Sequence, residues 1–375
     1  MTKVRNRLLL GGTAGAVLCA WGVFRNHDQF FVSYLFAYQF WFGIAAGCLG
    51  LVMLHALTGG AWGDVIHPLL EAGMMTLPWF ALFFIPLLWG LPALYPWARP
   101  EEVLRDTVLQ HKQIYLNVPF FELRALGYFG LWSWMAWRLH RWTRQSAEGD
   151  ADSTQQMNRH SGPGLVLYFL SLTFAALDWM MSLEPHWSST MYEVMIIVGY
   201  ALAAFAFAIC VLAWLRPPRP LVETWAQKPM WDLGNLVLAF VMFWAYLSFS
   251  QYLVIWSANL PEEITWYQRR QTGGWFWVAM TLIGFQFFLP FLALLGRRNK
   301  QRLERLAAIA ALLLAVHLVE LFWLVQPAFY PQGFHAHWMD GAVPVTLGAL
   351  WLAVFLTQLK KLPSPIGVYR AEAQA

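Results

Sequence analysis

Carboxylate and imidazole side chains lie inside long apolar stretches of this sequence. Asp178 interrupts one such stretch. His317 and Glu320 interrupt another at a spacing of three residues, which places them on one face of a helix. An ionisable group in hydrocarbon costs about 2.5–3.5 kcal/mol on the membrane-insertion scale, so each of these residues needs a role. Groups of this kind at several depths can transfer protons, and they can also accept the protons that quinol oxidation releases.

Two sets of residues are therefore candidates for chemistry. The candidates for proton transfer are Asp178, His317, Glu320, Glu184, His186, Glu122, Arg124, His55 and Glu71. The candidates for quinone binding are Asp178, Tyr38 and Gln39. A structural role is the alternative for each of them. Asp178 would then pair with Arg124 or cap a backbone group, and residues near the ends of the apolar stretches would be solvated or fix loops. The last description also suits Glu193, His335, His337 and Asp340.

The spacing of ligand residues predicts that this chain binds no haem, flavin, iron–sulfur cluster or metal ion. Cys19, Cys48 and Cys210 lie far apart, and the sequence contains no CxxC pair and no CxxCH motif. A b-type haem held by two histidines would need a facing pair, but His55 and His317 are expected at opposite depths. Without a redox centre of its own, the chain could contact quinol or quinone but could not transfer electrons alone.

These side chains need a membrane-spanning framework to position them. Of the 375 residues, 59% are hydrophobic and 12% are charged, against roughly 45–50% and 25% in soluble domains. That composition excludes a soluble enzyme, a disordered chain and a nucleic-acid-binding protein. We predict an all-α polytopic membrane protein with ten transmembrane helices, because ten apolar runs approach or exceed the roughly 20 residues that a crossing needs. The runs are 8–24, 30–57, 74–94, 118–139, 164–183, 191–215, 233–256, 273–295, 306–325 and 341–359.

The distribution of basic residues predicts the orientation of these helices. Eighteen of the 25 Lys and Arg residues lie on the side that holds the N-terminus, six lie on the other side, and Arg124 lies within a helix. By the positive-inside rule, both termini are cytoplasmic. The first run resembles a signal peptide, but bulky Trp21 and Phe24 at the cleavage region predict a retained anchor. Segments 95–117 (outside) and 140–163 (inside) are expected as the longest loops, the inner one polar and mobile.

Depth along the helices predicts a single polar cluster. Asp178 and Glu320 each lie roughly 21 Å, and His317 roughly 17 Å, from the inner ends of their runs. All three are therefore expected at one level in the outer part of the bilayer. Glu184 and His186 would lie at the mouth of this cluster, which would exchange protons with the periplasm and could face a quinone head group.

Two segments resemble a known family. SYLFAYQFWFGIAAGCLGLVMLHALTGGAWG (Ser33–Gly63) and FAALDWMMSLEPHWSSTMYE (Phe174–Glu193) look like the ActF subunit of bacterial alternative complex III, one of the NrfD/PsrC-like integral membrane proteins. The resemblance runs over most of the chain and makes residues 1–375 one membrane domain. It implies two four-helix bundles with peripheral first and last helices, and no redox centre bound by this chain.

The resemblance also implies partners and a role. The partners would be a related ten-helix subunit like ActC, a multi-haem cytochrome c, an iron–sulfur protein and a terminal oxidase, so haem c and iron–sulfur clusters would belong to the partners. The whole complex would be a quinol:cytochrome c or quinol:electron-carrier oxidoreductase of the bacterial inner membrane. This chain would contribute to quinone binding, proton transfer or assembly within it.

Two other classes of protein remain as alternatives. A structural scaffold of the same complex would need neither protons nor quinone. A secondary transporter would need matched broken helices in its two halves. Pro78, Pro86 and Pro290 interrupt apolar runs, but they form no matched pair in the sequence.

Overall fold

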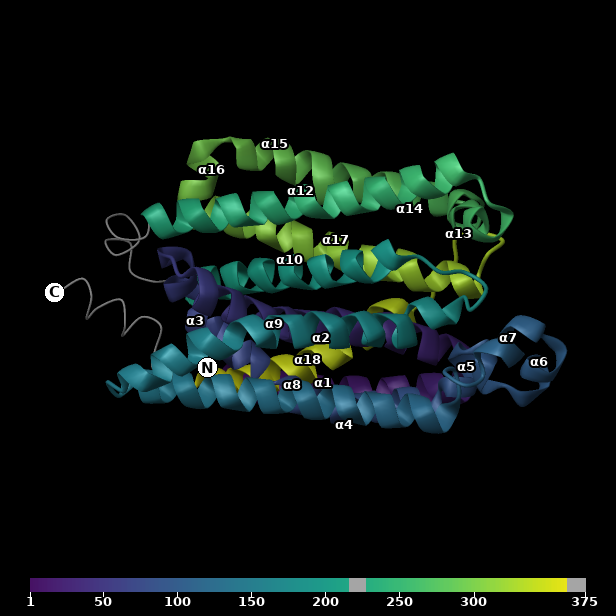
Figure 1. Ribbon diagram of the computed structural model, residues 1–375, viewed down its shortest axis with the longest axis horizontal. Coiled ribbons are helices and arrows are strands. Elements are labelled where there is room, and N and C mark those ends of the chain that lie inside the picture. Colours follow the sequence, from purple (N-terminus) through teal and green to yellow (C-terminus); the bar gives the residue numbers. More distant parts are fainter. Residues whose placement is uncertain (216–226, 363–375) are drawn as a thin grey trace.

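The computed structural model describes residues 1–215 and 227–362, which form helices and no strand. The long helices run side by side along one axis of the molecule (Figure 1). In this part of the chain, eight helices are long and apolar enough to cross a membrane, or nine if one bent pair counts as a single span. The chain is therefore a multi-pass membrane protein.

The long helices overlap the predicted apolar runs. The continuous ones are α1 (Thr2–Arg25), α2 (His27–Thr58), α8 (Val118–Ala147), α9 (Ala151–Trp179), α10 (Thr190–Leu215), α12 (Gln227–Ala258), α17 (Leu303–Phe329) and α18 (Met339–Leu359). The interrupted ones are α3 (Ala61–Met74) with α4 (Leu77–Trp89), and α14 (Trp275–Leu282) with the π-helical turn η3 (Ile283–Phe288) and α15 (Leu289–Leu295). Helix α8 is not among the helices apolar enough to count as a span, so the number ten stays a prediction.

Proline residues lie at both interruptions. Pro78 lies in the first turn of α4, and the axes of α3 and α4 differ by 42° across the short break before it. Pro290 follows η3 at the start of α15. A proline has no N–H to donate to the carbonyl four residues earlier, so a regular α-helix cannot continue through it without a local adjustment.

Helices α2 and α10 lie at the centre of the packing. Helix α2 packs against α3, α4, α9 and α18, helix α10 packs against α12 and α17, and helix α8 packs against α4 and α9. Helices α2 and α10 also pack against each other, and a Cβ atom at Gly47 would collide with the carbonyl oxygen of Tyr200. Glycine at this position therefore allows the two helix backbones to approach closely.

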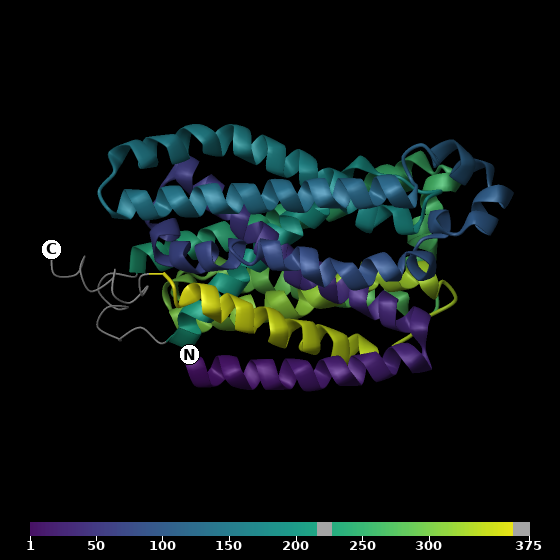
Figure 2. The same cartoon turned by 90° about the horizontal axis from the view of Figure 1, so that it is seen from below.

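The first and last helices pack against each other (Figure 2). Helix α1 lies at the edge of the molecule, as expected. Helix α18 is not peripheral, because it also packs against α2 and α3 and buries Trp351 completely. Trp351 donates a hydrogen bond to Thr76 across 2.9 Å, which fixes α18 to the break between α3 and α4.

The two ends of the bundle differ in structure (Figure 1). One end holds the N-terminus, the turn between α8 and α9, and helix α16 (Arg297–Gln301); there Lys360 donates a hydrogen bond to Thr2. The other end holds the short elements α5 (Leu91–Leu94), η1 (Pro96–Ala98), α6 (Pro100–Arg105), α7 (Thr107–Lys112), η2 (Met181–Leu183) and α13 (Pro261–Gln271). Arg216, Arg219 and Arg370, counted above on the cytoplasmic side, lie outside the described residues.

The prediction of a long loop over residues 140–163 is wrong. Segment 140–163 is helical except for the turn 148–150, because its Ala, Arg, Gln and Met residues continue a helix well beyond the apolar run. The Asp150 carboxylate accepts a hydrogen bond from the N–H of Asp152 and caps α9. Segment 95–117 folds into short helices, and the Asp106 carboxylate caps α7 by accepting the N–H of Val108 across 2.8 Å.

Candidate functional site

Asp178 forms a closed ion pair near the C-terminal end of α9. Its carboxylate receives two hydrogen bonds from the Arg124 guanidinium of α8, each 2.8 Å long, and a third of 2.9 Å from the Tyr128 hydroxyl. Arg124 also donates to the carbonyl of Tyr115, whose ring lies under the guanidinium. Asp178 is fully buried. The bidentate geometry satisfies both charges, so the structure matches the alternative in which Asp178 pairs with Arg124.

His317 and Glu320 form a second buried pair on α17. Nδ1 of His317 lies 2.8 Å from a carboxylate oxygen of Glu320, and the indole N–H of Trp244 on α12 donates to the other oxygen. Each of the two residues is only 3% exposed. Nε2 of His317 is buried and has no hydrogen-bond partner in residues 1–215 and 227–362. A buried nitrogen without a partner is costly, so this position is suited to a water molecule or a transferred proton.

The prediction of one cluster made of Asp178, His317 and Glu320 is wrong. No described hydrogen bond or ion pair joins Asp178 to the other two residues, and aromatic rings lie between them: Trp179 contacts Phe42, Phe42 contacts Tyr200, and Tyr200 contacts His317. The depth argument counted from predicted starts at Gly164 and Leu306. Helix α9 begins at Ala151, 13 residues before its predicted start, whereas α17 begins at Leu303, so the two counts do not start from equivalent points.

Glu184 and His186 do not lie together at the opening of one polar cluster. Glu184 pairs with Arg269 at 3.1 Å and with Arg270 at 3.3 Å, both on α13. His186 is exposed and lies 2.7 Å from Asp106 beside α7. The two side chains thus connect to different elements at the same end of the molecule.

Arg270 is the least exposed of the positively charged residues at this end. Its guanidinium is 1% exposed, donates to the carbonyl of Leu324 on α17 across 2.7 Å and lies over the ring of Trp266. Burial lowers the pKa of Arg270, and the neighbouring Glu184 carboxylate opposes this effect. Nε of Arg270 has no acceptor in the described part of the chain. Arg270 lies between the predicted apolar runs 233–256 and 273–295, so only the structure identifies it as a buried cation.

The ionisable residues of the cytoplasm-assigned end form a third cluster, on α2, α3 and α8. Glu71 is buried and lies 2.6 Å from Nδ1 of His140 and 4.0 Å from His67. His55 lies 3.4 Å from Asp64, and its ring is next to that of His67. His140 is a residue that the sequence did not single out. It directly follows an apolar run, and a helix continuing past residue 139 would have placed it toward α3.

The remaining candidates have structural partners or face outward. Tyr38 and Gln39 of α2 are fully buried; Tyr38 donates to the carbonyl of Phe80, and Gln39 accepts a hydrogen bond from Tyr200. Glu122 is exposed on α8, away from the buried pair next to it in sequence. None of these three side chains lines the cavity described below.

Asp340 fixes the loop before α18. Its carboxylate accepts hydrogen bonds from Gln29 and Ser33 of α2, from Gln326 of α17 and from the backbone N–H of His337. Four donors from three segments satisfy the charge. Its position therefore matches the loop-fixing alternative.

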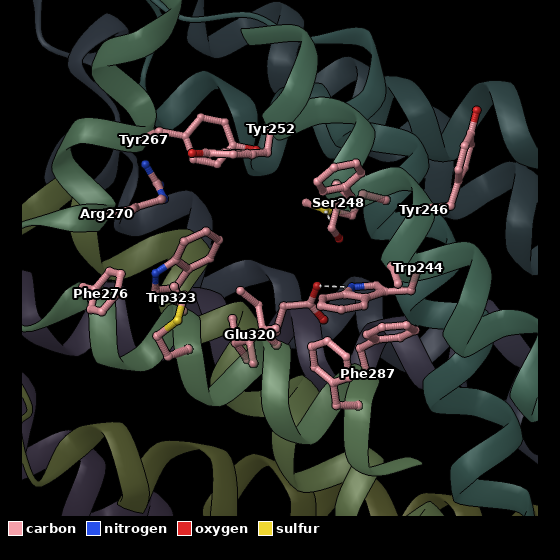
Figure 3. Close-up of a pocket in the computed structure, with 18 of the residues that line it drawn as sticks. Trp244, Tyr246, Ser248, Tyr252, Tyr267, Arg270, Phe276, Phe287, Glu320 and Trp323 are labelled. Carbon is pink, nitrogen blue, oxygen red and sulfur yellow. Dashed lines mark hydrogen bonds between the residues drawn. The ribbon is translucent and has the colours of Figure 1, made fainter. Parts of the chain in front are cut away.

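A cavity of about 750 Å³ lies between α12, α13, α14–η3 and α17 (Figure 3). Glu320 and Trp244 lie at its deep side, and Arg270 lies on its wall at the end that carries α13. The rest of the lining is mainly aromatic and aliphatic, including Phe287 and Trp323. Since Glu320 also contacts His317, the cavity adjoins the second buried pair and not Asp178.

Comparison of the chain with protein-family models and with curated proteins finds no match. The arguments about function therefore rest on the residues of this chain. No group of three or more His, Cys, Asp or Glu side chains suited to a metal ion occurs in residues 1–215 and 227–362.

Proposed function

We propose that this chain is an integral membrane subunit of a quinol:cytochrome c, or quinol:electron-carrier, oxidoreductase of the alternative complex III type, where it contributes to proton transfer and assembly. The main support is the His317–Glu320 pair, a carboxyl and an imidazole buried together in an apolar helix. The proposal includes ten spans, cytoplasmic termini and a place in the bacterial inner membrane. Its partners are an ActC-like subunit, a multi-haem cytochrome c and an iron–sulfur protein.

The His317–Glu320 pair can hold and pass on one proton. With Nδ1 and the carboxylate 2.8 Å apart, a proton can lie on either group without movement of the helix. The unpartnered Nε2 then provides the second position, through which the imidazole can receive or release a proton. Trp244 donates a hydrogen bond to the other carboxylate oxygen and so fixes the position of the Glu320 side chain.

A path across the membrane also needs groups near each surface. At the end assigned to the cytoplasm, Glu71, His140 and His67 form a buried carboxylate–imidazole cluster of the same chemistry. At the other end, Glu184 lies beside Arg270, which contacts the same helix as Glu320. Water molecules would have to bridge the intervals between these clusters, as they do in other polar interiors.

The test is Glu320→Gln in the purified native complex. Glutamine keeps the size and the acceptor for Trp244 but cannot carry a proton. Because a positioned proton-transfer group typically contributes about 10²–10⁴-fold, we expect quinol oxidation coupled to proton release to fall by at least about tenfold. The matched control is Glu122→Gln on the exposed face of α8, which should leave the rate unchanged.

A structural scaffold is the second candidate, and the Arg124–Asp178 pair favours it. Three hydrogen bonds satisfy Asp178 so fully that it has no need of a proton or a ligand. A Glu320→Gln complex that assembles, oxidises quinol and releases protons at the normal rate would establish the scaffold role and reject proton transfer through this chain.

A further inference from the structure

The cavity beside Glu320 has no part in the proposed proton transfer. Its volume of about 750 Å³ is within the roughly 300–1,000 Å³ of pockets that hold small molecules. Aromatic and aliphatic side chains from α12, α14, η3 and α17 make up most of its lining. An ordered water molecule needs two to four polar partners, so most of this space offers no site for water. The cavity therefore suits an apolar occupant.

The lining residues extend along the helix axes. On α12 they run from Met242 to Tyr252, about 15 Å, and on the facing wall they run from Phe276 to Phe288, about 18 Å. The hydrocarbon core of a bilayer is about 30 Å thick, so one leaflet contributes about 15 Å. In a membrane-spanning bundle, the cavity is therefore about as long as the hydrocarbon of one leaflet and runs parallel to its chains.

Free polar side chains lie at the α13 end of the cavity. Tyr252 of α12 and Tyr267 of α13 lie side by side there, with ring centroids 5.2 Å apart (Figure 3). Neither hydroxyl has a hydrogen-bond partner among the described residues, and exposed Gln271 of α13 also lines the cavity. At the deep side, the Glu320 carboxylate already has the two partners described above. The free donors therefore lie where the ester groups of a lipid would be, and tyrosine is typical of that level of a bilayer.

The rim of the cavity is exposed and apolar. Tyr246 and Phe249 of α12 are 65% and 61% exposed, and Phe288 of η3 is 53% exposed. In a membrane-spanning bundle, such a face meets hydrocarbon and not water. A hydrocarbon chain could therefore enter sideways from the bilayer.

We propose that this cavity holds one acyl chain of a bilayer phospholipid, which enters from the leaflet at the α13 end. The ester carbonyls accept hydrogen bonds from Tyr252 and Tyr267, and the chain extends between α12 and α14–η3 toward Phe287. The inference goes beyond the proposed function and does not depend on it, because it uses only the geometry of the cavity. The bound chain fills a space that the helices leave open, and so it stabilises the contact between them.

A transmembrane helix of a partner protein suits the cavity less well. A helix is about 10 Å across, so a segment about 15 Å long takes up roughly 1,200 Å³, well above the volume of the cavity. A single hydrocarbon chain is thinner, and it can adapt to an irregular wall.

The test is photolabelling of the native complex in nanodiscs that contain phosphatidylglycerol with a diazirine on one acyl chain. We expect label on Ser248 and Leu282, which line the cavity from α12 and α14. Leu292 on α15 is the internal reference, because it is 64% exposed and does not line the cavity. Its labelling measures contact with the lipid that surrounds the whole protein.

Two variants fill the cavity. Ala245→Phe, on the wall formed by α12, should reduce the labelling of Leu282 relative to Leu292 by about tenfold, because a large side chain takes the place of the acyl chain. Met280→Trp, on α14, fills the cavity from the opposite wall and covers the case in which the first variant fails to assemble. Ala239→Phe is the matched control, since Ala239 is exposed on α12 outside the cavity, and it should label like the wild type.

The position of the diazirine tests the direction of the chain. Near the ester it should label Tyr252 and Tyr267, and near the terminal methyl group it should label Phe287. The opposite order would overturn the inference, as would equal labelling of Leu282 in the control and the two filling variants. Label confined to Leu292 would also overturn it and would show that lipid does not enter, as expected if a partner helix covers the cavity.

Discussion

The two buried carboxylates of this protein differ in how completely they are paired. Asp178 accepts two hydrogen bonds from the Arg124 guanidinium and a third from Tyr128, and both donors lie on α8. Glu320 interacts with the His317 imidazole and with an indole N–H, and it lies on a cavity wall. Asp178 thus stabilises the contact between α8 and α9, while Glu320 lies in a less fully paired position beside open space.

The Arg124–Asp178 pair predicts a specific pattern of stability. Arg124→Gln leaves the Asp178 carboxylate buried without its cation, so we expect a loss of about 3–5 kcal/mol in the free energy of unfolding. Adding Asp178→Asn removes the uncompensated charge, and the double variant should regain a large part of that loss. Thermal unfolding of the purified complex measures both effects. Additive losses in the two single variants would show that the pair is not coupled.

The sequence predicted the residue types of the site better than their grouping. It identified Asp178, His317 and Glu320, because charges in apolar runs stand out, and it offered Arg124 as the partner of Asp178. It could not assign depth, because that depends on where each helix ends in three dimensions. It missed His140 as a partner of Glu71, because residues 140–163 were expected to form a loop.

At the scale of the elements, one short helix of the connection between α4 and α8 has a side-chain cap. Helix α7 begins after Asp106, whose carboxylate accepts the N–H groups of Val108 and Leu109 and lies 2.7 Å from His186. Desolvation acts to raise the pKa of Asp106, but the hydrogen bonds from Leu109 and Val108 and the contact with His186 together outweigh it and hold the pKa below its ordinary value. The charged carboxylate is therefore the form that supports the helix.

This capping predicts a pH dependence. A carboxyl group whose pKa is lowered by folding stabilises the folded state above its unfolded pKa, here about 3.8, and this contribution is lost as the pH falls through the lower, folded value. Hydrogen-exchange protection of the Val108 and Leu109 amides, corrected for intrinsic rates, should therefore fall as the pH is lowered from about 5 to about 2. This range extends about one to two pH units on either side of the unfolded pKa of 3.8. Asp106→Asn keeps an acceptor but does not titrate, so its protection should not change with pH. The same loss in the Asn variant would assign the effect to another group.

At the scale of the whole molecule, the basic residues and the geometry separate the same two ends. The N-terminus, the α8–α9 turn and α16 lie together, while α5–α7 and α13 lie at the opposite end (Figure 1). Hydropathy alone located the long helices, because about 20 apolar residues in a row have few other stable environments in a protein. It could not predict that α8 and α9 extend past the apolar runs, or that α18 packs between α1 and α2, since both depend on packing.

The orientation of the bundle can be tested with reporter fusions. We expect a reporter inserted after Gly149, in the α8–α9 turn, to report the cytoplasm, and one inserted after exposed Ile114 to report the periplasm. Activity of the complex serves as the check that each insertion is tolerated. A periplasmic signal from the first position would reverse the assigned topology.

The close contact between Gly47 and Tyr200 has a consequence for how the protein can work. Transporters of the alternating-access type rock one bundle against the other, which requires an interface that can slide or hinge. Here the backbones of α2 and α10 meet with no room for a single added carbon atom, and Phe42 and Tyr200 interlock beside them. Any sliding of α2 against α10 would therefore first have to separate the two backbones.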